Sequence, residues 1–280
     1  MRVINAQDIK NAVKALFISL NCSIGDDITC ALKKAYDSEE NETAKAVLSQ
    51  LLENNEIAHK EQIPLCQDTG MAILFVEYGD KLTIDGDFTQ AVNQGVREAY
   101  TDGYLRKSVV DDPVFARKNT GDNTPCVIHT QIVSGETLKI TAAAKGFGSE
   151  NMSGIKMLSP SAGVEGVKDF VLQVVKNAGP NPCPPMVVGV GIGGTFEQSA
   201  QLAKKATVRN IDTKNADKRY AQLEDELLCK INELNIGPAG LSGKTTALKV
   251  NIEYAPTHIA SIPVAVNICC HACRHKSIEI

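Results

Sequence analysis

The sequence predicts an α+β protein, in which a helical N-terminal region packs on a mixed or antiparallel β-sheet with flanking helices. Residues 6–55 repeat apolar side chains at helical spacing, as in Val13, Phe17 and Leu20. The character of the chain changes at Pro64, after which apolar and β-branched runs appear between glycines and prolines. No repeat, low-complexity stretch or linker interrupts the chain. We therefore expect a single domain over 1–280, with a helical lobe at 1–58 and an α+β core at 59–280.

The elements of the core follow from local pattern. Strands are expected where β-branched and apolar residues run together, at 71–77, 81–84, 127–133, 137–144, 186–190, 245–252 and 262–268. Helices are expected where apolar residues recur every three or four positions, at 88–99, 162–177, 197–208 and 217–234. Ser134-Gly135-Glu136 separates two of the strands, which predicts a hairpin of 127–133 with 137–144.

The bulk composition excludes several classes of protein. With 280 residues, of which 43% are hydrophobic, the chain can bury a full core. A net charge of −4 gives no electrostatic footprint for nucleic acid. No apolar run approaches the ~20 residues of a membrane span, and the first residues lack the apolar region of an export signal. We therefore expect a cytoplasmic protein without a membrane partner, whose thiols stay reduced.

The cysteines carry the clearest chemical signal. There are nine, and their odd number and wide spacing argue against a disulfide framework. Cys66, Cys183 and Cys270 lie more than 80 residues apart, each beside Pro, Gly or Arg, which suggests a metal site assembled by folding. Three thiolates on an iron–sulfur cluster leave one iron open to act as a Lewis acid. Asp68, two residues after Cys66, could do acid–base work beside such a site.

The remaining cysteines and glycine-rich loops are given less weight. Cys22, Cys30, Cys126 and Cys229 lie on helical or strand patterns and are expected to be small buried hydrophobes. The segment 189–194 matches G-x-G-x-x-G, but no acidic strand end follows, so its glycines are expected to let the backbone approach a small ligand or the cluster. The segment 237–245 imitates a Walker A loop, yet Pro238 replaces a required glycine, and a turn or an anion-binding nest is expected.

Taken together, several segments resemble the class I, iron–sulfur-dependent fumarase and tartrate dehydratase family. They cover roughly residues 60–276 in order: Pro64-Leu-Cys66-Gln67-Asp68-Thr69-Gly70, Lys145-Gly-Phe-Gly148-Ser-Glu-Asn151, Cys183-Pro-Pro, Gly189-Val-Gly-Ile-Gly-Gly-Thr195, Thr245-Thr246-Ala-Leu, Pro256-Thr-His258-Ile-Ala and Cys270-x-Ala272-x-Arg274. The match is to the N-terminal half of the single-chain enzymes, or to the α subunit of the two-subunit ones. One departure is Ser242-Gly243, where the family has a pair of glycines.

The resemblance implies a site and a cofactor. It implies that Cys66, Cys183 and Cys270 bind a [4Fe–4S] cluster, with Cys269 and Cys273 as alternatives to the third ligand. It also implies five positions around the substrate, namely Gln67, Asp68, Arg106, Gly148 and His258. The implied reaction is the reversible hydration of a C4 dicarboxylate, with fumarate and L-malate expected first and L-tartrate next.

These residue types suit that chemistry. Arg106 can hold a carboxylate in bidentate fashion, and N–H groups around Gly148 could take further oxygens. Asp68 and His258 are both candidates for proton transfer. The chain ends at Ile280, six residues beyond Arg274, so we expect an α subunit that works with a separate β subunit, as αβ or (αβ)₂, with the active site at the subunit boundary.

Three other functions compete with the hydro-lyase. An electron-transfer or redox-sensing protein would complete its cluster with a fourth thiolate, from Cys269 or Cys273. A zinc-stabilised binding module could use the C-x-x-C of Cys270 and Cys273, although no second half is present at the usual spacing. A nucleotide-dependent oxidoreductase would depend on the glycine loop at 189–194.

Overall fold

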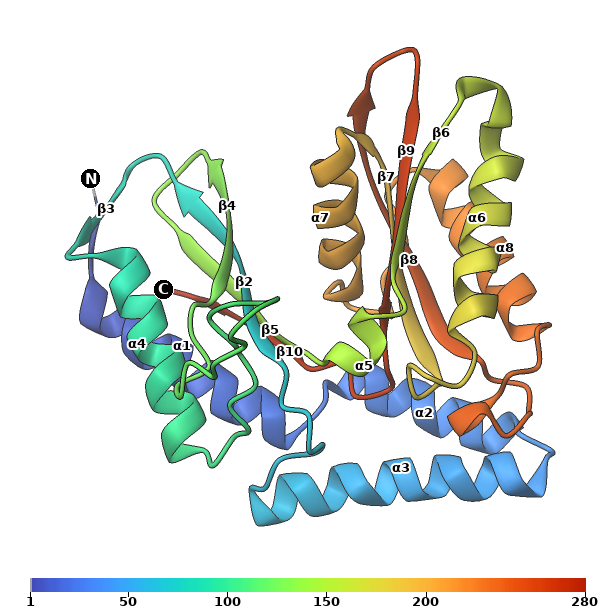
Figure 1. Cartoon of the computed structure of the whole chain (residues 1–280), viewed down its shortest axis with the longest axis horizontal. Coiled ribbons are helices and arrows are strands. Elements are labelled where there is room, and N and C mark those ends of the chain that lie inside the picture. The colour runs from blue at the N-terminus through green and yellow to red at the C-terminus, as the bar shows by residue number, and fades with distance from the viewer. Residues whose placement is uncertain (1) are drawn as a thin grey trace. The chain divides into compact units, whose positions relative to one another are not determined.

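A computed structural model describes residues 2–280, and the chain divides into two compact units (Figure 1). Unit 1 contains the segment ending at Gly25, together with Asn54–Phe147 and Arg274–Ile280. Unit 2 contains Asp26–Glu53 and Gly148–Cys273. The helical N-terminal region contributes to both units, and the expected boundary near residue 58 stays a prediction. That the two units act as a single domain stays a prediction.

Unit 1 is built on a four-stranded sheet in the order β10-β5-β2-β4. The central strand β2 runs parallel to β4 and antiparallel to β5, which in turn pairs antiparallel with β10. A separate parallel pair joins β1 to β3. The elements of this unit are β1 (Arg2–Asn5), α1 (Ala6–Cys22), β2 (Met71–Gly79), β3 (Leu82–Asp85), α4 (Phe88–Asp102), β4 (Val127–Val133), β5 (Leu138–Lys145) and β10 (His275–Glu279).

The predicted hairpin of 127–133 with 137–144 is wrong, because β2 lies between these two strands. Most of β2 is buried, so it requires a neighbour on each edge. The short link from β4 to β5 therefore crosses over the end of β2. Gly79 permits the crossing, since a Cβ there would lie 2.5 Å from the carbonyl oxygen of Gly135.

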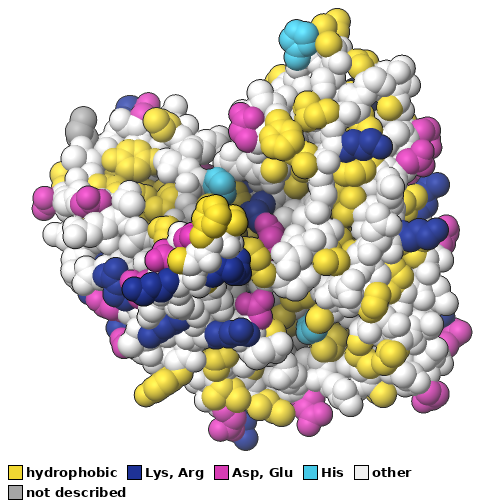
Figure 2. Space-filling view, in the orientation of Figure 1, with side chains coloured by type: hydrophobic (Ala, Val, Ile, Leu, Met, Phe, Trp, Pro, Cys, Tyr) yellow, Lys and Arg dark blue, Asp and Glu magenta, His cyan; other side chains and the backbone are white. Residues whose placement is uncertain are grey.

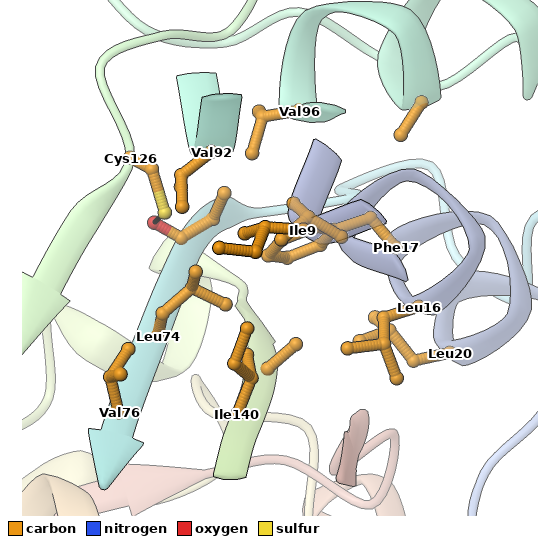
Figure 3. Close-up of a cluster of buried hydrophobic side chains, with 14 of the residues drawn as sticks. Ile9, Leu16, Phe17, Leu20, Leu74, Val76, Val92, Val96, Cys126 and Ile140 are labelled. Atoms are coloured by element: carbon orange, nitrogen blue, oxygen red, sulfur yellow. Dashed lines mark hydrogen bonds between the residues drawn. The ribbon is translucent and has the colours of Figure 1, made fainter. Parts of the chain in front are cut away.

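The core of unit 1 lies between the sheet and helices α1 and α4. Ile9 and Phe17 of α1, Val96 of α4 and Leu74 of β2 are fully buried, and their side chains gather in one cluster (Figure 3). The expected helical spacing of the N-terminal region is confirmed, because its apolar residues form the buried face of α1. Each such side chain contributes about 1.5–3 kcal/mol when it is fully buried.

Unit 2 has a second four-stranded sheet, in the order β6-β9-β7-β8. Strand β7 runs parallel to β8 and antiparallel to β9, while β6 pairs antiparallel with β9. Helix α7 covers one face and helices α6 and α8 cover the other (Figure 1). The elements are α2 (Asp26–Ser38), most of α3 (Glu42–Glu61), α5 (Phe147–Glu150), β6 (Gly154–Leu158), α6 (Gly163–Ala178), β7 (Met186–Gly194), α7 (Phe196–Thr207), α8 (Lys218–Asn232), β8 (Ala247–Thr257) and β9 (Ile262–Cys269), with short 3₁₀ turns at Pro160–Ala162 and Pro238–Gly240. The predicted α+β class is confirmed.

Two glycines of β7 allow α7 to lie directly on the sheet. A Cβ at Gly189 would lie 2.1 Å from the carbonyl oxygen of Ala203, and one at Gly191 would lie 2.0 Å from that of Ser199. The expectation that these glycines open the backbone to a ligand or a cluster is therefore wrong. They serve close helix–strand packing, which is the role that glycine plays where two main chains meet.

The segment Ala6–Ser38 has the length and hydropathy of a membrane-spanning helix. It is nevertheless two helices, α1 and α2, separated by the non-helical residues 23–25. Half of its most apolar stretch is buried inside the protein, where α1 supplies core residues of unit 1. Its hydropathy is thus accounted for by packing.

Candidate active site

Asp68 stands in the loop that leads into β2, and main-chain donors hold its carboxylate. Its Oδ1 accepts a hydrogen bond from the N–H of Gly70 at 2.9 Å, and its Oδ2 accepts one from the N–H of Phe147 at 2.8 Å. A Cβ at Gly146 would lie 3.2 Å from Oδ2, so the chain after β5 passes close to this carboxylate. The side chain is half-buried and has a fixed orientation.

Tyr100, which is buried on α4, contacts the loop that carries Asp68. Its hydroxyl donates to the carbonyl oxygens of Thr69 at 2.8 Å and Gly70 at 3.0 Å. Burial raises the pKa of Tyr100, so its hydroxyl stays protonated and remains a donor. Asn123 also donates to Gly70 through Nδ2 at 3.1 Å. The loop that carries Asp68 is therefore anchored to two other elements of unit 1.

Asp68 and Arg106, both predicted from sequence, line one pocket of about 490 Å³ within unit 1. Arg106 is exposed in the long loop after α4, and its carbonyl oxygen accepts a hydrogen bond from the Thr69 hydroxyl at 3.0 Å. This contact ties the main chain of Arg106 to the residue next to Asp68. Arg117 and Ser108, which no sequence motif marks, line the same pocket.

Cys66 and Gln67 lie on the same loop as Asp68. The Cys66 thiol is half-buried and donates to Oε1 of Gln67 at 3.4 Å. The preceding residue, Leu65, donates its N–H to the carbonyl oxygen of Asn21 at 2.8 Å and accepts from Nδ2 of Asn54 at 3.0 Å. Both bonds fasten the main chain beside Cys66, so its thiol belongs to a well-defined loop.

In unit 2, the segments that carry Cys183 and Cys270 lie side by side. The carbonyl oxygen of Cys183 accepts the N–H of His271 at 3.5 Å and lies 3.0 Å from Nδ1 of its ring. Antiparallel pairing of Val187 with Cys269 brings the start of β7 beside the end of β9. Cys183 is exposed in a left-handed conformation with φ of 53°, and Cys270 is half-buried.

The neighbours of Cys270 differ from it in burial. Cys269 is buried on β9, and Cys273 is buried with its thiol donating to the carbonyl oxygen of Thr207 at 3.2 Å. A metal ligand needs access to the metal, and Cys270 has the greatest exposure of the three. This difference favours Cys270 as the ligand of this segment.

Gly148 lies in the short helix α5, where a Cβ would have its nearest neighbour, the carbonyl oxygen of Asn181, at 4.0 Å. The main chain of α5 thus passes beside the loop that carries Cys183. His258, by contrast, is exposed in the segment between β8 and β9, with Nδ1 accepting the N–H of Ala260 at 3.2 Å. Strand β9, which separates His258 from Cys270, has 8 residues and so spans about 25 Å. Unit 2 therefore does not bring His258 to the cysteines.

An iron–sulfur cluster needs several thiolate ligands around one site. Among residues 2–280, no group of three or more His, Cys, Asp or Glu side chains stands within reach of one metal ion. Cys66 belongs to unit 1, whereas Cys183 and Cys270 belong to unit 2. All three are at least partly exposed on loops, while burial raises the pKa of Cys22 and Cys126 and keeps them as thiols. Cysteine thiolates are the usual ligands of such a cluster, and the exposure of these three side chains is compatible with that chemistry.

Comparison with known proteins agrees with this chemistry. Residues 10–279 match the family model described as Fumarate hydratase (Fumerase). A Methanocaldococcus jannaschii protein, named provisionally as an L(+)-tartrate dehydratase subunit alpha, is 44% identical over 271 residues, covering 95% of each chain. The L(+)-tartrate dehydratase alpha subunits of Escherichia coli K12 and Shigella sonnei are each 34% identical over 257 residues, covering 91% of this chain and 85% of theirs.

The family model spans nearly the whole chain and includes the loops of Cys66, Asp68, Arg106, Cys183 and Cys270. The chemistry shared by this family and these relatives is the addition or removal of water at a C4 dicarboxylate. The chain is thus a hydro-lyase, and it belongs to the fumarate hydratase (Fumerase) family.

Proposed function

We propose that this chain is the α subunit of a two-subunit, iron–sulfur-dependent hydro-lyase that interconverts fumarate and L-malate. The observation that carries the proposal is the pocket of unit 1, which both Asp68 and Arg106 line. In a reaction that moves a proton at a carbon next to a carboxylate, a carboxyl group can transfer the proton and an arginine can bind the carboxylate. L(+)-tartrate is the second candidate substrate, favoured by the names of the relatives.

In this proposal Cys66, Cys183 and Cys270 hold a [4Fe–4S] cluster. When bound, a cluster with three thiolate ligands supplies one open iron that acts as a Lewis acid toward a hydroxyl group or water. The partial exposure of the three thiols and the contact between the loops of Cys183 and His271 support this ligand set.

The protein's own residues bind and orient the substrate and move a proton. Arg106 would bind one substrate carboxylate with two parallel N–H donors. The side chain of Gln67 and the main-chain N–H of Gly148 would donate to further oxygens. Asp68 would transfer the proton at the carbon next to the one that carries the hydroxyl group, since Gly70 and Phe147 hold its carboxylate in one orientation.

Asp68 is preferred to His258 for this proton because it shares a pocket with Arg106. His258 lies at the far end of β9 from Cys270 in the same unit. Its role in proton transfer stays a prediction, which His258→Asn would address. A general acid or base contributes typically about 10²–10⁴-fold to rate, so Asp68→Asn should lower kcat by at least about 10²-fold.

A separate β subunit is part of the proposal. The relatives are named as alpha subunits, and they align with this chain over most of their length. We therefore propose an αβ or (αβ)₂ assembly that works in the cytoplasm, with the β subunit completing the substrate site. Full turnover by the purified α chain alone would contradict this assembly.

The first experiment is anaerobic reconstitution of the α chain, followed by measurement of iron and acid-labile sulfide. Wild type should bind about four of each, and Cys66→Ser, Cys183→Ser and Cys270→Ser should each lose them. Cys30→Ser and Cys229→Ser are the matched controls. The expected burial of these two cysteines is wrong, because both are exposed on helices α2 and α8, and their substitution should leave iron binding unchanged. Iron uptake that is indifferent to the first three substitutions would refute the ligand set.

The second experiment names the substrate. The reconstituted α chain, combined with its β subunit, is assayed with fumarate, L-malate and L(+)-tartrate under the same anaerobic conditions. A value of kcat/KM that is highest for fumarate and L-malate would support the proposal, whereas a preference for tartrate would select the second candidate. If a complex that contains the cluster turned over none of these three compounds, the proposed substrates would be wrong.

A further inference from the structure

The pocket that contains Asp68 and Arg106 holds a second arginine, Arg117. Arg106 and Arg117 both line the same cavity of about 490 Å³, together with Ser108 and Phe147. Sequence reasoning did not select Arg117, and the proposed function assigns no role to it. A second cation in the pocket of a dicarboxylate enzyme calls for an explanation.

The main chain fixes the position of Arg117 relative to Arg106. The segments after each arginine pair with one another, because the N–H of Asp111 donates to the carbonyl oxygen of Lys118 at 2.9 Å and that of Thr120 donates to Val109 at 3.0 Å. Nδ2 of Asn119 also donates to the carbonyl oxygen of Lys107 at 2.9 Å. The two arginines thus stand on opposite arms of one hydrogen-bonded loop.

This loop is in turn anchored beside Asp68. Oδ1 of Asn123 accepts the N–H of Ser108 at 2.7 Å and that of Val109 at 3.2 Å, while its Nδ2 donates to Gly70 at 3.1 Å. Asn123 is completely buried, so these bonds are protected from water. Both arginines are therefore held at the same pocket as the carboxylate of Asp68.

Arg117 itself sits in an unusual local structure. Its φ of 46° is left-handed, a conformation that arginine seldom adopts. The turn before it is held by the Asp112 carboxylate, which accepts the N–H of Val114 at 2.9 Å and that of Ala116 at 2.7 Å. Nη1 of Arg117 donates to the carbonyl oxygen of Pro113, which leaves the other edge of the guanidinium available to a ligand.

The surface charge around this loop suits an anion. Lys and Arg side chains gather over the loops of unit 1 (Figure 2), where Arg106, Lys107, Arg117 and Lys118 follow closely in sequence. The acidic side chains of the same loop are already engaged. Asp122 pairs with Arg97 at 2.8 Å, and the Asp112 carboxylate accepts three main-chain N–H groups. Such a cationic surface attracts a dianionic substrate to the pocket.

We propose that Arg117 is a substrate-binding residue that holds the second carboxylate of the C4 dicarboxylate, while Arg106 holds the first. The inference rests on the proposed function and extends it to substrate specificity. One guanidinium group pairs with one carboxylate through two parallel hydrogen bonds. Among the residues that line this pocket, Arg117 is the other cationic side chain. Arg117 therefore selects dicarboxylates over monocarboxylates.

The test uses the reconstituted complex of the α chain, its cluster and the β subunit. Arg117→Met should raise KM for the dicarboxylate by about 10- to 100-fold and change kcat by less than about 3-fold, because the lost contact is made equally in the ground state and in the transition state. The KM of Arg117→Lys should lie between that of wild type and that of Arg117→Met. Lys118→Met, one residue further along and outside the pocket lining, is the control and should match wild type.

A purely structural role gives a different result. Arg117→Gln keeps a donor for the carbonyl oxygen of Pro113 but removes the charge. The proposal predicts that this variant shows the same rise in KM as Arg117→Met, with an unchanged melting temperature. Recovery of wild-type KM in Arg117→Gln, or a lower melting temperature and kcat without a change in KM, would overturn it.

Direct binding separates this inference from the proposed function. Succinate, a dicarboxylate that cannot be hydrated, and butyrate, the corresponding monocarboxylate, are titrated calorimetrically into the complex. Arg117→Met should weaken succinate binding by about 10-fold or more and leave butyrate binding unchanged. If wild type binds succinate but turns over no dicarboxylate, the proposed function fails and Arg117 is still tested. Equal succinate affinity in wild type and Arg117→Met would refute the role of Arg117.

Discussion

Main-chain N–H groups hold two carboxylates of this protein, those of Asp68 and Glu39, in fixed orientations. Asp68 accepts two such bonds in the pocket of unit 1. Glu39, which is buried in unit 2, accepts three, from Glu40, Asn41 and Lys244. The bond from Lys244 shows that the anion held by the Walker-like turn at 237–245 is the protein's own Glu39. The Glu39 carboxylate therefore occupies the expected anion-binding nest.

The charge state of Asp122 makes the stability of the folded protein depend on pH. Burial alone would raise its pKa, but hydrogen bonds from Arg97 and Thr124 outweigh burial and lower the pKa to about 2. Because the folded pKa lies below the ordinary value of 3.8, the stabilisation is present above pH 4 and is lost as the pH falls toward 2. Asp122→Asn should therefore melt below wild type at pH 6, and the two should converge near pH 2.

Thermal unfolding of wild type and Asp122→Asn between pH 2 and pH 7 checks this expectation. Arg97→Gln should reproduce much of the effect, since its Nε donates to Asp122 at 2.8 Å. The gap in melting temperature should narrow in high salt, because Arg97 is largely exposed. A gap that stays constant down to pH 2 would show that Asp122 contributes no titrating interaction.

Sequence reasoning selected the candidate site residues that carry a local motif. Cys66, Gln67 and Asp68 share one segment, and Cys183 stands in a Pro-rich turn, so short patterns mark them. Arg117 carries no such mark. Its place in the pocket depends on the hydrogen bonds that pair Asp111 with Lys118 and on the anchoring of Asn123 to Gly70. These contacts are set by tertiary structure, which a single sequence does not display.

At the scale of elements, α7 packs closely on β7 in unit 2. Gly191→Ala would place a methyl group 2.0 Å from the carbonyl oxygen of Ser199 and 2.5 Å from the nitrogen of Ala203. Both are main-chain atoms, so the helix must move away from the sheet. We expect a destabilisation of about 3 kcal/mol, in the range of an overpacked core.

Chemical denaturation of Gly191→Ala measures this cost. Gly148→Ala is the matched control, because its added methyl group would meet no atom closer than 4.0 Å. The control should unfold with the wild-type free energy. An equal free energy of unfolding for Gly191→Ala and wild type would mean that α7 is not held against β7 in solution.

The identity of the elements was more predictable than their pairing. Helices and strands follow from apolar periodicity, and most expected segments are confirmed. The order of the first sheet could not be read in the same way, because β2 separates β4 from β5 although the latter two are neighbours in sequence. Strand β10 escaped detection since His275–Glu279 is short and polar, and its pairing with β5 joins residues far apart in the chain.

At the scale of the whole molecule, the chain passes between the two units four times, and the last passage brings β10 to unit 1. Pairing of Ser277 with Thr141 and its neighbours closes the β5 edge of the sheet. Removal of residues 275–280 should therefore expose that edge and unfold unit 1 while unit 2 keeps its structure.

Hydrogen exchange on the truncated chain distinguishes the two units. Amides of β2 and β5 should lose protection, and amides of β7 and β9 should keep it. Ser277→Ala removes only the 2.8 Å contact between the hydroxyls of Ser277 and Thr141 and serves as the control. In this variant the amides of both units should keep their protection. Undiminished protection of β5 after truncation would show that unit 1 does not need β10.

The place of β10 has a consequence for how the protein is made. On the ribosome, the residues of β2, β4 and β5 emerge early. Their sheet lacks its edge strand until the residues of β10 leave the exit tunnel. The continuous stretch of unit 2 from Gly148 to Cys273 is synthesised before that moment. The unit that contains the start of the chain is thus the last to be completed, and a stalled nascent chain would carry an open sheet edge accessible to chaperones.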